Sequence, residues 1–284
     1  MLRIRQPVLL CLALGYAGIA AAQLPPELAG ERADYADWLA TAPTSPLAAI
    51  AQQRIGDGLR LGPPDADFPL DGVPEHRITQ RGGAVVLEDG GGRRPVPRGV
   101  PVRLGAYTLV AGGAAGDAVL TVFGPTRPDR APEFHEYRPA LVFTGPLSPA
   151  ERAGRVRVLG VDGIEVEAAE AGSVLVPIGG ERVRLRVLRL PSGRGEESEL
   201  EIFFRDETNG RSSYPAGRFV ALVPERDGRY RLDFNRARNP FCAYSSAYPC
   251  PAPWRGNAID APVAAGERYE AGGLAAPAAA PEVP

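Results

Sequence analysis

The side chains that could do chemistry are concentrated between positions 206 and 257 of this 284-residue sequence. Carboxylates, amides, tyrosines and arginines occur there among glycines and prolines, directly beyond apolar runs of strand length. We call them the polar cluster: Asp206, Thr208, Tyr214, Arg218, Asp233, Asn235, Arg236, Asn239, Tyr244 and Asn257. Much of the chain around them is too rich in proline for regular structure, so these side chains are candidates for binding, for catalysis or for ordering the backbone.

Three members of the polar cluster stand at predicted strand ends. Asp206 follows the strand 199–204, and Arg218 begins the next one, 219–223. Asp233 ends the strand after that. If these strands are neighbours, Asp206 and Arg218 can form a bidentate ion pair, because a planar guanidinium matches the geometry of a carboxylate.

Three functions are compatible with the polar cluster. In the first, it binds a small polar ligand, with Tyr214, Tyr244 and Trp254 as stacking faces. In the second, Asp206 and Asp233 are a carboxylate pair that hydrolyses a glycan-like envelope substrate, which requires both to face an open cleft. In the third, the side chains are buried and lock the proline-rich tail by bonding its backbone groups.

The sequence names no reaction, and whether the chain is an enzyme stays open at this point. We take forward a non-catalytic role, either structural or the binding of a small polar ligand, centred on Asp206, Arg218 and Asp233. The carboxylate-dependent hydrolase is the alternative. A cleft beside these three residues would favour binding or catalysis, whereas complete burial would favour the structural role.

Two cysteines, Cys242 and Cys250, lie in the proline-rich stretch with seven residues between them. The third, Cys11, lies in the N-terminal segment. An isolated pair in an exported chain predicts a disulfide. A zinc or redox site is the alternative, but the stretch has no histidine and no C-x-x-C spacing. We therefore expect no metal and no cofactor.

Composition narrows the chemistry further. The sequence has no lysine, which excludes Schiff-base chemistry and phosphate binding by a P-loop. No G-x-S-x-G motif is present, and His76 and His135, the two histidines, lie outside the polar cluster. The formal net charge of -2 provides no basic field, so nucleic acid is not expected as a partner. The oligomeric state is not indicated.

Residues 1–22 have the pattern of a signal peptide. Arg3 and Arg5 form a basic start, an apolar run follows at 8–21, and three alanines precede Gln23. Cys11 lies inside the apolar run, which argues against lipid attachment. The sequence therefore predicts an exported protein, periplasmic or secreted, without a membrane span after cleavage.

The elements that hold the polar cluster are predicted to be mainly strands. A helix is expected at 27–40, with Trp38 packed against the sheet, and a second helix is expected to begin at Ser45-Pro46 and to carry Ile50. Residues 56–75 are predicted as loop. Strand patterns then recur at 77–79, 84–88, 100–104, 107–110, 118–123, 141–143, 155–159, 164–167, 173–178, 182–190, 199–204, 219–223 and 229–234. The alternation breaks at Val187-Leu188, which predicts a bulge or a bend.

The strands divide into two tandem units. Val-Pro-x-Gly occurs at 96–99 and at 176–179, where we predict hairpins, each followed by Val-Arg-Leu and then by a strand that leads into a polar turn. We interpret this as two β-units of similar topology, from a duplication or from chance recurrence in a chain rich in Val, Gly and Pro. The predicted fold is mainly β, with two small sandwich- or barrel-like units and an N-terminal helical segment. The predicted boundaries are 1–22 signal peptide, 23–55 N-terminal helices, 56–132 first unit, 133–270 second unit and 271–284 disordered tail.

Several motifs resemble one known family. FRDETNG at 204–210, SYPAGRF at 213–219, DFNRARNPFCAY at 233–244, CPAP at 250–253, Asn257 and AGERY at 265–269 are similar to an uncharacterised bacterial family, domain of unknown function 1684. The segment 33–50 resembles the opening of that family. The resemblance implies one folded unit and no established activity. Trp254 stands where the family has a second proline, and Gly256 where it commonly has a glutamate, so a role of that glutamate is in doubt here.

Overall fold

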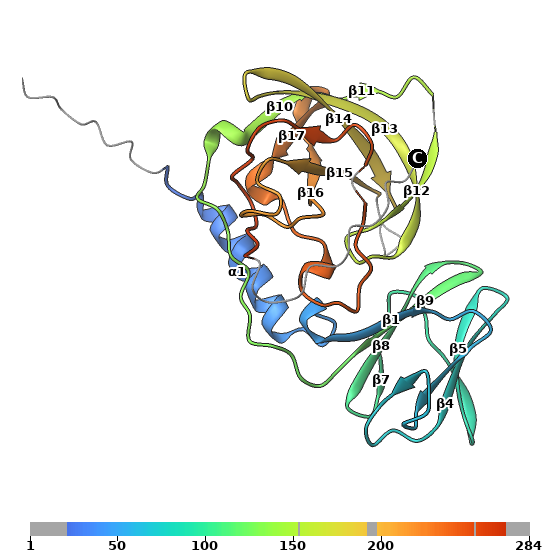
Figure 1. The fold of residues 1–284 in the computed structure, drawn as a ribbon. Helices are drawn as coiled ribbons and strands as arrows, with labels where there is room; N and C mark the ends of the chain where they lie inside the picture. Colours follow the sequence, from blue (N-terminus) through green and yellow to red (C-terminus); the bar gives the residue numbers. More distant parts are fainter. Residues whose placement is uncertain (1–21, 153, 192–197, 253, 271–284) are drawn as a thin grey trace, which may run out of the picture.

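The computed structural model describes residues 22–152, 154–191, 198–252 and 254–270. The predicted signal peptide, except Ala22, and the predicted tail lie outside the described residues. The described chain is mainly β with one N-terminal α-helix, which confirms the predicted fold class (Figure 1). Among its helices, none combines the length and the apolar character that crossing a membrane requires.

The helix α1 spans Pro26–Thr41, as predicted. Its proline lies in the first turn, where the missing N–H costs nothing, and the helix ends where Ala42 turns extended ahead of a proline. Leu28, Tyr35 and Leu39 are its buried residues. Ser45 then caps a short 3-10 helix, Pro46–Ala48, by accepting a hydrogen bond from the backbone N–H of Leu47.

The prediction that the second helix continues through Ile50 is wrong. The chain instead forms strand β1 (Ala49–Arg54), which pairs with β9 (Asp117–Phe123). Pairing with a distant strand overrides the local helical preference of an alanine-rich segment, which is weak over so few residues.

The first half of the chain forms two sheets. One has the order β1-β9-β8-β7 and the other the order β3-β2-β4-β5-β6. The remaining strands of the two sheets are β2 (Leu59–Gly62), β3 (Phe68–Pro69), β4 (His76–Arg81), β5 (Ala84–Asp89), β6 (Gly92–Pro95), β7 (Val102–Leu104) and β8 (Tyr107–Ala114). The prediction that residues 56–75 form a loop is wrong, because β2 and β3 lie within this range. Leu59, Leu61 and Phe68 are buried in the core despite their Gly/Pro/Asp-rich surroundings.

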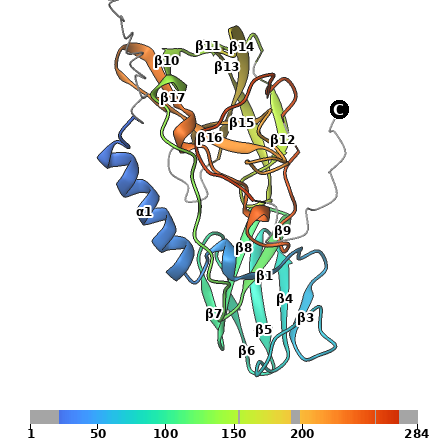
Figure 2. The same cartoon turned by 60° about the vertical axis from the view of Figure 1, so that its left-hand side comes forward.

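The second half forms one nine-stranded sheet that curls into a nearly closed barrel (Figure 2). Its main path is β10-β17-β16-β15-β14-β13-β11, while β12 pairs with β13 and β18 with β15. The strands are β10 (Val142–Pro146), β11 (Ser148–Pro149), β12 (Arg155–Leu159), β13 (Glu165–Ile178), β14 (Glu181–Leu190), β15 (Glu199–Asp206), β16 (Arg218–Pro224), β17 (Arg229–Asp233) and β18 (Ala258–Ile259). Short 3-10 helices occur at Pro139–Leu141, Arg226–Gly228, Phe234–Arg236 and Phe241–Ala243.

Side chains alternate between the two faces of β15, β16 and β17. Ile202, Phe204, Val220, Leu222 and Leu232 point into the barrel core. The residues between them therefore lie on the outer face. One register irregularity interrupts the neighbouring pair β13–β14, between Glu170 and Gly172, opposite the predicted break at Val187-Leu188.

The two Val-Pro-x-Gly segments have different topologies. Residues 176–179 lead from β13 into β14 through a hairpin, as predicted, with Gly179 and Gly180 at positive φ. Residues 96–99 lead from β6 to β7, which belong to different sheets, so the predicted hairpin is wrong there. The boundary between the two predicted units stays a prediction.

Candidate functional site

The nine residues predicted to bind a ligand are all buried. None is more than 8% exposed, and Arg218 and Asn235 are 0% exposed. They are Asp206, Thr208, Tyr214, Arg218, Asp233, Asn235, Asn239, Tyr244 and Asn257. Side chains enclosed to this degree offer little surface to a ligand, and their hydrogen bonds identify what they hold instead.

Arg218 and Asp206 form a buried ion pair. Nη2 of Arg218 donates to Oδ2 of Asp206 at 2.8 Å and to the carbonyl of Val263 at 2.8 Å. Its Nη1 donates to the carbonyl of Ala265. The predicted pair is therefore present, but the predicted bidentate geometry is wrong, because the second nitrogen bonds the C-terminal segment. Burial lowers the pKa of Arg218, and the charge of Asp206 opposes that shift.

The other carboxylate oxygen of Asp206 closes a turn. Oδ1 accepts hydrogen bonds from the backbone N–H of Thr208 at 2.8 Å, from its hydroxyl at 2.6 Å, and from the N–H of Val263 at 3.1 Å. The carbonyl of Thr208 in turn accepts from the N–H groups of residues 211–213. Asp206 thus has both oxygens occupied by groups of the protein itself.

Asp233 belongs to a second network. Its Oδ1 accepts from the backbone and the side chain of Asn235, each at 2.9 Å, and its Oδ2 accepts from Arg236. Arg236 also makes a two-point pair with Glu31 on α1, at 2.8 and 3.0 Å. Within the described chain, no hydrogen bond or ion pair joins Asp233 to the Asp206–Arg218 pair. The structure therefore separates the predicted three-residue centre into two networks.

A third network surrounds Glu267, which the sequence analysis missed. This fully enclosed carboxyl accepts from the backbone N–H of Asn239 at 2.8 Å and from the hydroxyl of Tyr244. Tyr35 of α1 donates to the Tyr244 hydroxyl at 3.2 Å. Burial raises the pKa of Glu267 to about 7. The motif AGERY contains this glutamate, so the resemblance of that motif to the family could have identified Glu267 from the sequence.

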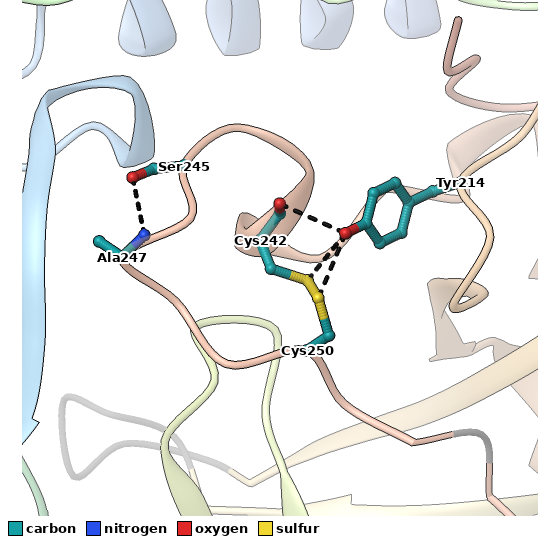
Figure 3. Close-up of a disulfide and its surroundings, with 5 residues drawn as sticks. All are labelled: Tyr214, Cys242, Ser245, Ala247 and Cys250. Carbon is teal, nitrogen blue, oxygen red and sulfur yellow. Dashed lines mark hydrogen bonds between the residues drawn. A yellow bond between two sulfur atoms is a disulfide. The ribbon is translucent and has the colours of Figure 1, made fainter. Parts of the chain in front are cut away.

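Cys242 and Cys250 form the predicted disulfide, with Cα atoms 5.5 Å apart (Figure 3). The hydroxyl of Tyr214 points at this bridge and lies 3.3 Å from the carbonyl of Cys242 and 3.2 Å from Sγ of Cys250. Ser245, inside the loop, donates to the carbonyl of Ala49 at 2.8 Å. The disulfide loop is therefore fixed to the start of β1 as well as to the barrel.

Asn257 completes the barrel wall between two strands. Its side-chain amide donates to the carbonyls of Arg186 and Phe203, each at 3.0 Å, and its Oδ1 accepts from the N–H of Arg186 at 2.7 Å. Strands β14 and β15 pair only from Leu188 to Leu190, so the amide continues their ladder where the backbones separate. Its role is structural.

The predicted stacking faces are also part of the core. Tyr214 is 1% exposed, and Tyr244 and Trp254 are each 5% exposed. Trp254 packs edge-on against Phe203 at 6.2 Å between ring centroids. Their burial favours a role in packing over the stacking of a ligand. Trp38 packs against a core cluster that includes Ala49 of β1 and Phe123 of β9, and its ring neighbours are Tyr35 and Phe241.

An open groove of about 870 Å³ lies between α1 and the outer face of β15, β16 and β17. Figure 1 shows α1 lying along this side of the barrel. We call it the helix–sheet groove, lined by Glu31, Asp34, Tyr35, Trp38, Val161, Glu199, Glu201, Phe219, Val220, Ala221, Val223, Arg231, Asp233, Arg236, Arg238, Asn239 and Phe241. The four residues of α1 share one helix face, because their spacing is three, four and seven positions from Glu31.

The comparisons with known proteins concern the barrel. Residues 131–268 match the family model described as Protein of unknown function (DUF1684). Through this segment the chain belongs to the DUF1684 family. The match confirms the resemblance carried by the motifs at 204–269 and begins after the segment 33–50, whose resemblance stays a prediction.

Several solved structures match this DUF1684 protein, and one of them illustrates the similarity. It is the solution NMR structure of an uncharacterized protein from gene locus rrnAC0354 of Haloarcula marismortui. The two chains are 30% identical, the similarity covers 51% of this chain and 80% of that one, and the TM-score is 0.44. No curated protein matches the chain.

Two of the motif glycines have a structural reason in the DUF1684 segment. Gly217 has a φ of +113°, and a Cβ there would lie 2.5 Å from the carbonyl oxygen of Phe204. Gly266 has a φ of +72°, and its Cβ would lie 2.6 Å from the carbonyl oxygen of Phe234. Both positions need the absence of a side chain, because backbone passes directly over them.

The histidines of the DUF1684 protein do not form a catalytic or metal site with the polar cluster. His135 Nε2 lies 3.3 Å from the hydroxyl of Ser213, but Ser213 is 0% exposed and already bonds Thr208 at 2.8 Å. Burial lowers the pKa of His135 to about 4. His76 lies in β4, with Nδ1 2.7 Å from the carbonyl of Pro74. Across the described ranges, no three His, Cys, Asp or Glu residues are grouped as metal ligands.

The groove also contains a perturbed carboxyl that the sequence analysis missed. Glu201 lies on the outer face of β15 and is half-buried. Burial raises its pKa to about 7, the negative charges of Glu199 and Asp162 raise it further, and Arg238 lowers it. A carboxyl of this kind in a cleft is a candidate for a functional residue.

Proposed function

We propose that this chain is an exported, non-catalytic protein that binds a small ligand in the helix–sheet groove. The observation that carries the proposal is the contrast between two regions. The polar cluster is enclosed, with no predicted binding residue more than 8% exposed. The groove beside it is open and brings together charged and aromatic side chains from α1, the outer face of the sheet and the segment after β17.

The dimensions and lining of the groove support binding. A volume of about 870 Å³ falls in the range of small-molecule sites, roughly 300–1,000 Å³. Tyr35, Trp38, Phe219 and Phe241 supply flat apolar surface, and the charged residues around them supply specificity. Asp233 and Asn239 are the two members of the predicted site that also line the groove.

The polar cluster has a structural role in this proposal. It ties the segment 257–269 to β15, to β16 and to the segment after β17 through Asn257, the Asp206–Arg218 pair and Glu267. We do not carry the hydrolase forward. It requires Asp206 to face an open cleft, whereas the Asp206 side chain is 0% exposed and fully bonded.

Export is part of the same proposal and rests on the sequence of residues 1–22. The protein would then be periplasmic or secreted. A net charge of -2 argues against nucleic acid as its partner.

The test is a thermal-shift screen of sugars, amino acids, amines and phosphates against three proteins. Ala221→Trp fills the groove from an exposed strand position, and Ala84→Trp places the same ring at an exposed position of β5, outside the groove. The proposal expects compounds that raise the Tm of the parent and of Ala84→Trp but not of Ala221→Trp. Equal stabilisation of all three proteins, or stabilisation of none, would contradict it.

A further inference from the structure

The charged residues that line the helix–sheet groove are of two kinds. Committed residues form a hydrogen bond or an ion pair with another residue of the described chain, and uncommitted residues do not. Arg236 is committed, because it pairs with Glu31 at 2.8 Å and with Asp233. Arg231 lies 3.7 Å from Glu225 at the edge of the groove. These pairs neutralise one another and leave little charge for a ligand.

Three carboxylates of the groove have no hydrogen bond or ion pair within the described residues: Asp34, Glu199 and Glu201. Among the arginines of the groove, Arg238 alone also has no side-chain hydrogen bond or ion pair within the described residues. Its guanidinium lies 4.5 Å from the centre of the Tyr35 ring. The uncommitted charges of the described groove are therefore three negative and one positive. A ligand with a positive charge is the one that this excess attracts.

Aromatic rings line the same groove as these carboxylates. Trp38 lies 5.8 Å from Tyr35 and 6.0 Å from Phe241, measured between ring centroids. Tyr35 is buried and has the guanidinium of Arg238 over its face, whereas Trp38 and Phe241 are half-buried and are the rings that remain for a ligand. Ring faces of this kind also accommodate an apolar body attached to the charge.

Asn239 adds an unsatisfied acceptor at the same wall. The residue is 1% exposed and lines the groove, and its amide donates to the carbonyl of Arg268 at 2.9 Å. Its Oδ1 has no hydrogen-bond partner in the described structure. A buried carbonyl oxygen without a donor is unfavourable, and an N–H group of a ligand would satisfy it.

We propose that the ligand of the helix–sheet groove is an organic cation, an ammonium group on a flat apolar body, with Glu201 as its main anionic contact. The inference rests on the proposed function. The apolar body lies against the half-buried rings of Trp38 and Phe241, and the ammonium lies toward β15.

The affinity of such a ligand depends on pH through Glu201. Its pKa is about 7 in the free protein, so the carboxyl is largely neutral below that value and charged above it. Because the cation binds the charged form, affinity rises as pH increases through about 7. The charged and titratable groups around Glu201 are Glu199, Asp162, Arg238, Glu31, Asp34, Arg231, Asp233 and Arg236.

The test is calorimetry with three probes of the same shape: phenethylamine, 2-phenylethanol and 3-phenylpropionate. We expect the amine to bind most tightly, and its affinity to increase about tenfold between about pH 6 and about pH 8. Glu201→Gln should weaken the amine at the higher pH by about tenfold and remove the pH dependence. Glu181→Gln, at an exposed strand end outside the groove, is the matched control and should bind like the parent.

The outcomes separate this inference from the proposed function. If the alcohol or the acid binds as tightly as the amine and Ala221→Trp abolishes that binding, the groove binds ligands but not specifically cations. If the amine fails to bind while other compounds stabilise the parent and not Ala221→Trp, the cation inference alone is overturned. If no compound distinguishes the parent from Ala221→Trp, the proposed function is overturned as well.

Discussion

Arg218 carries a charge at a position that is 0% exposed, because groups of the protein supply the hydrogen-bond acceptors that water would otherwise supply. A carboxylate and two backbone carbonyls accept its hydrogen bonds. Its ring neighbour is Phe204, whose centroid lies 5.3 Å from the guanidinium carbon. Such a pair need not be more stable than an apolar one, but removing one partner leaves the other charge buried and alone.

Replacing Arg218 with alanine should therefore destabilise the protein strongly. We expect the free energy of unfolding to fall by about 3–5 kcal/mol, because Asp206 would keep its charge without a counter-ion. Denaturant unfolding followed by circular dichroism measures the change. Arg182→Ala, at an exposed position of β14, is the control and should differ from the parent by less than about 0.5 kcal/mol. An Arg218→Ala variant as stable as this control would contradict the structural role.

Glu267 should give the protein a pH-dependent stability. Its pKa is raised from 4.5 to about 7 by burial, so between these values the folded protein binds more protons than the unfolded chain. Stability then falls as pH rises through this window. In Glu267→Gln this contribution is absent, and the variant should gain stability relative to the parent from about pH 4.5 to about pH 7. Unfolding curves measured across the window, with Glu181→Gln as control, test this; parallel curves for Glu267→Gln and the parent would refute it.

At the scale of elements, the disulfide loop connects three parts of the fold. It packs on Trp38 of α1 through Phe241, on β1 through Ser245, and on Tyr214 through the bridge itself. The loop is short and rich in proline, so its order depends on these contacts and on the covalent link.

Removing the disulfide should reduce stability without removing ligand binding. For Cys242→Ser/Cys250→Ser we expect the free energy of unfolding to fall by about 2–3 kcal/mol, because the closed loop no longer reduces the conformational entropy of the unfolded chain. Denaturant midpoints of the variant, and of the parent with and without reductant, give the value. Identical midpoints for the oxidised and reduced parent would show that the bridge contributes nothing.

The strands were predictable from the sequence where one face is buried. Glu199 to Phe204 alternates between a core face and an outer face, and Asp162-Gly163 and Gly179-Gly180 mark the adjoining turns. Strands β1, β2 and β3 were not predicted, because alanine, glycine and proline carry little strand signal and distant pairing decides their structure.

The polar cluster was also predictable as a set, but its role was not. Position alone identified Asp206, Arg218 and Asp233 as residues at strand ends. Only coordinates could distinguish a cluster turned inward, bonding its own backbone, from one turned toward a cleft. Glu201 was missed for the opposite reason, because a glutamate on the outer face of a strand has the pattern of ordinary solvent exposure.

At the scale of the whole molecule, the groove is assembled from parts that are far apart in the sequence. One wall comes from the DUF1684 segment at 131–268. The other comes from α1, Pro26–Thr41, which lies far before that segment in the sequence. The connection 124–138 runs back alongside α1 (Figure 2), where Arg127 donates to the carbonyl of Ala42. The family segment alone would leave the groove without its second wall.

Export makes a prediction for the intact chain. We expect the protein recovered from the periplasm or the medium to begin at Gln23, because the three alanines before it form the cleavage site. N-terminal sequencing and intact mass measure this directly. A protein that retains Met1 and stays in the cytoplasm would contradict export, while leaving the groove untouched.

In our proposal a ligand occupies the helix–sheet groove while the polar cluster only holds the fold. The most direct test is an NMR titration of isotope-labelled protein with phenethylamine, read residue by residue. We predict that the shifts are confined to the groove, with Tyr35, Glu201 and Phe219 among the residues affected, and are absent in Ala221→Trp. Shifts centred on Asp206 and Arg218 instead would contradict the proposal.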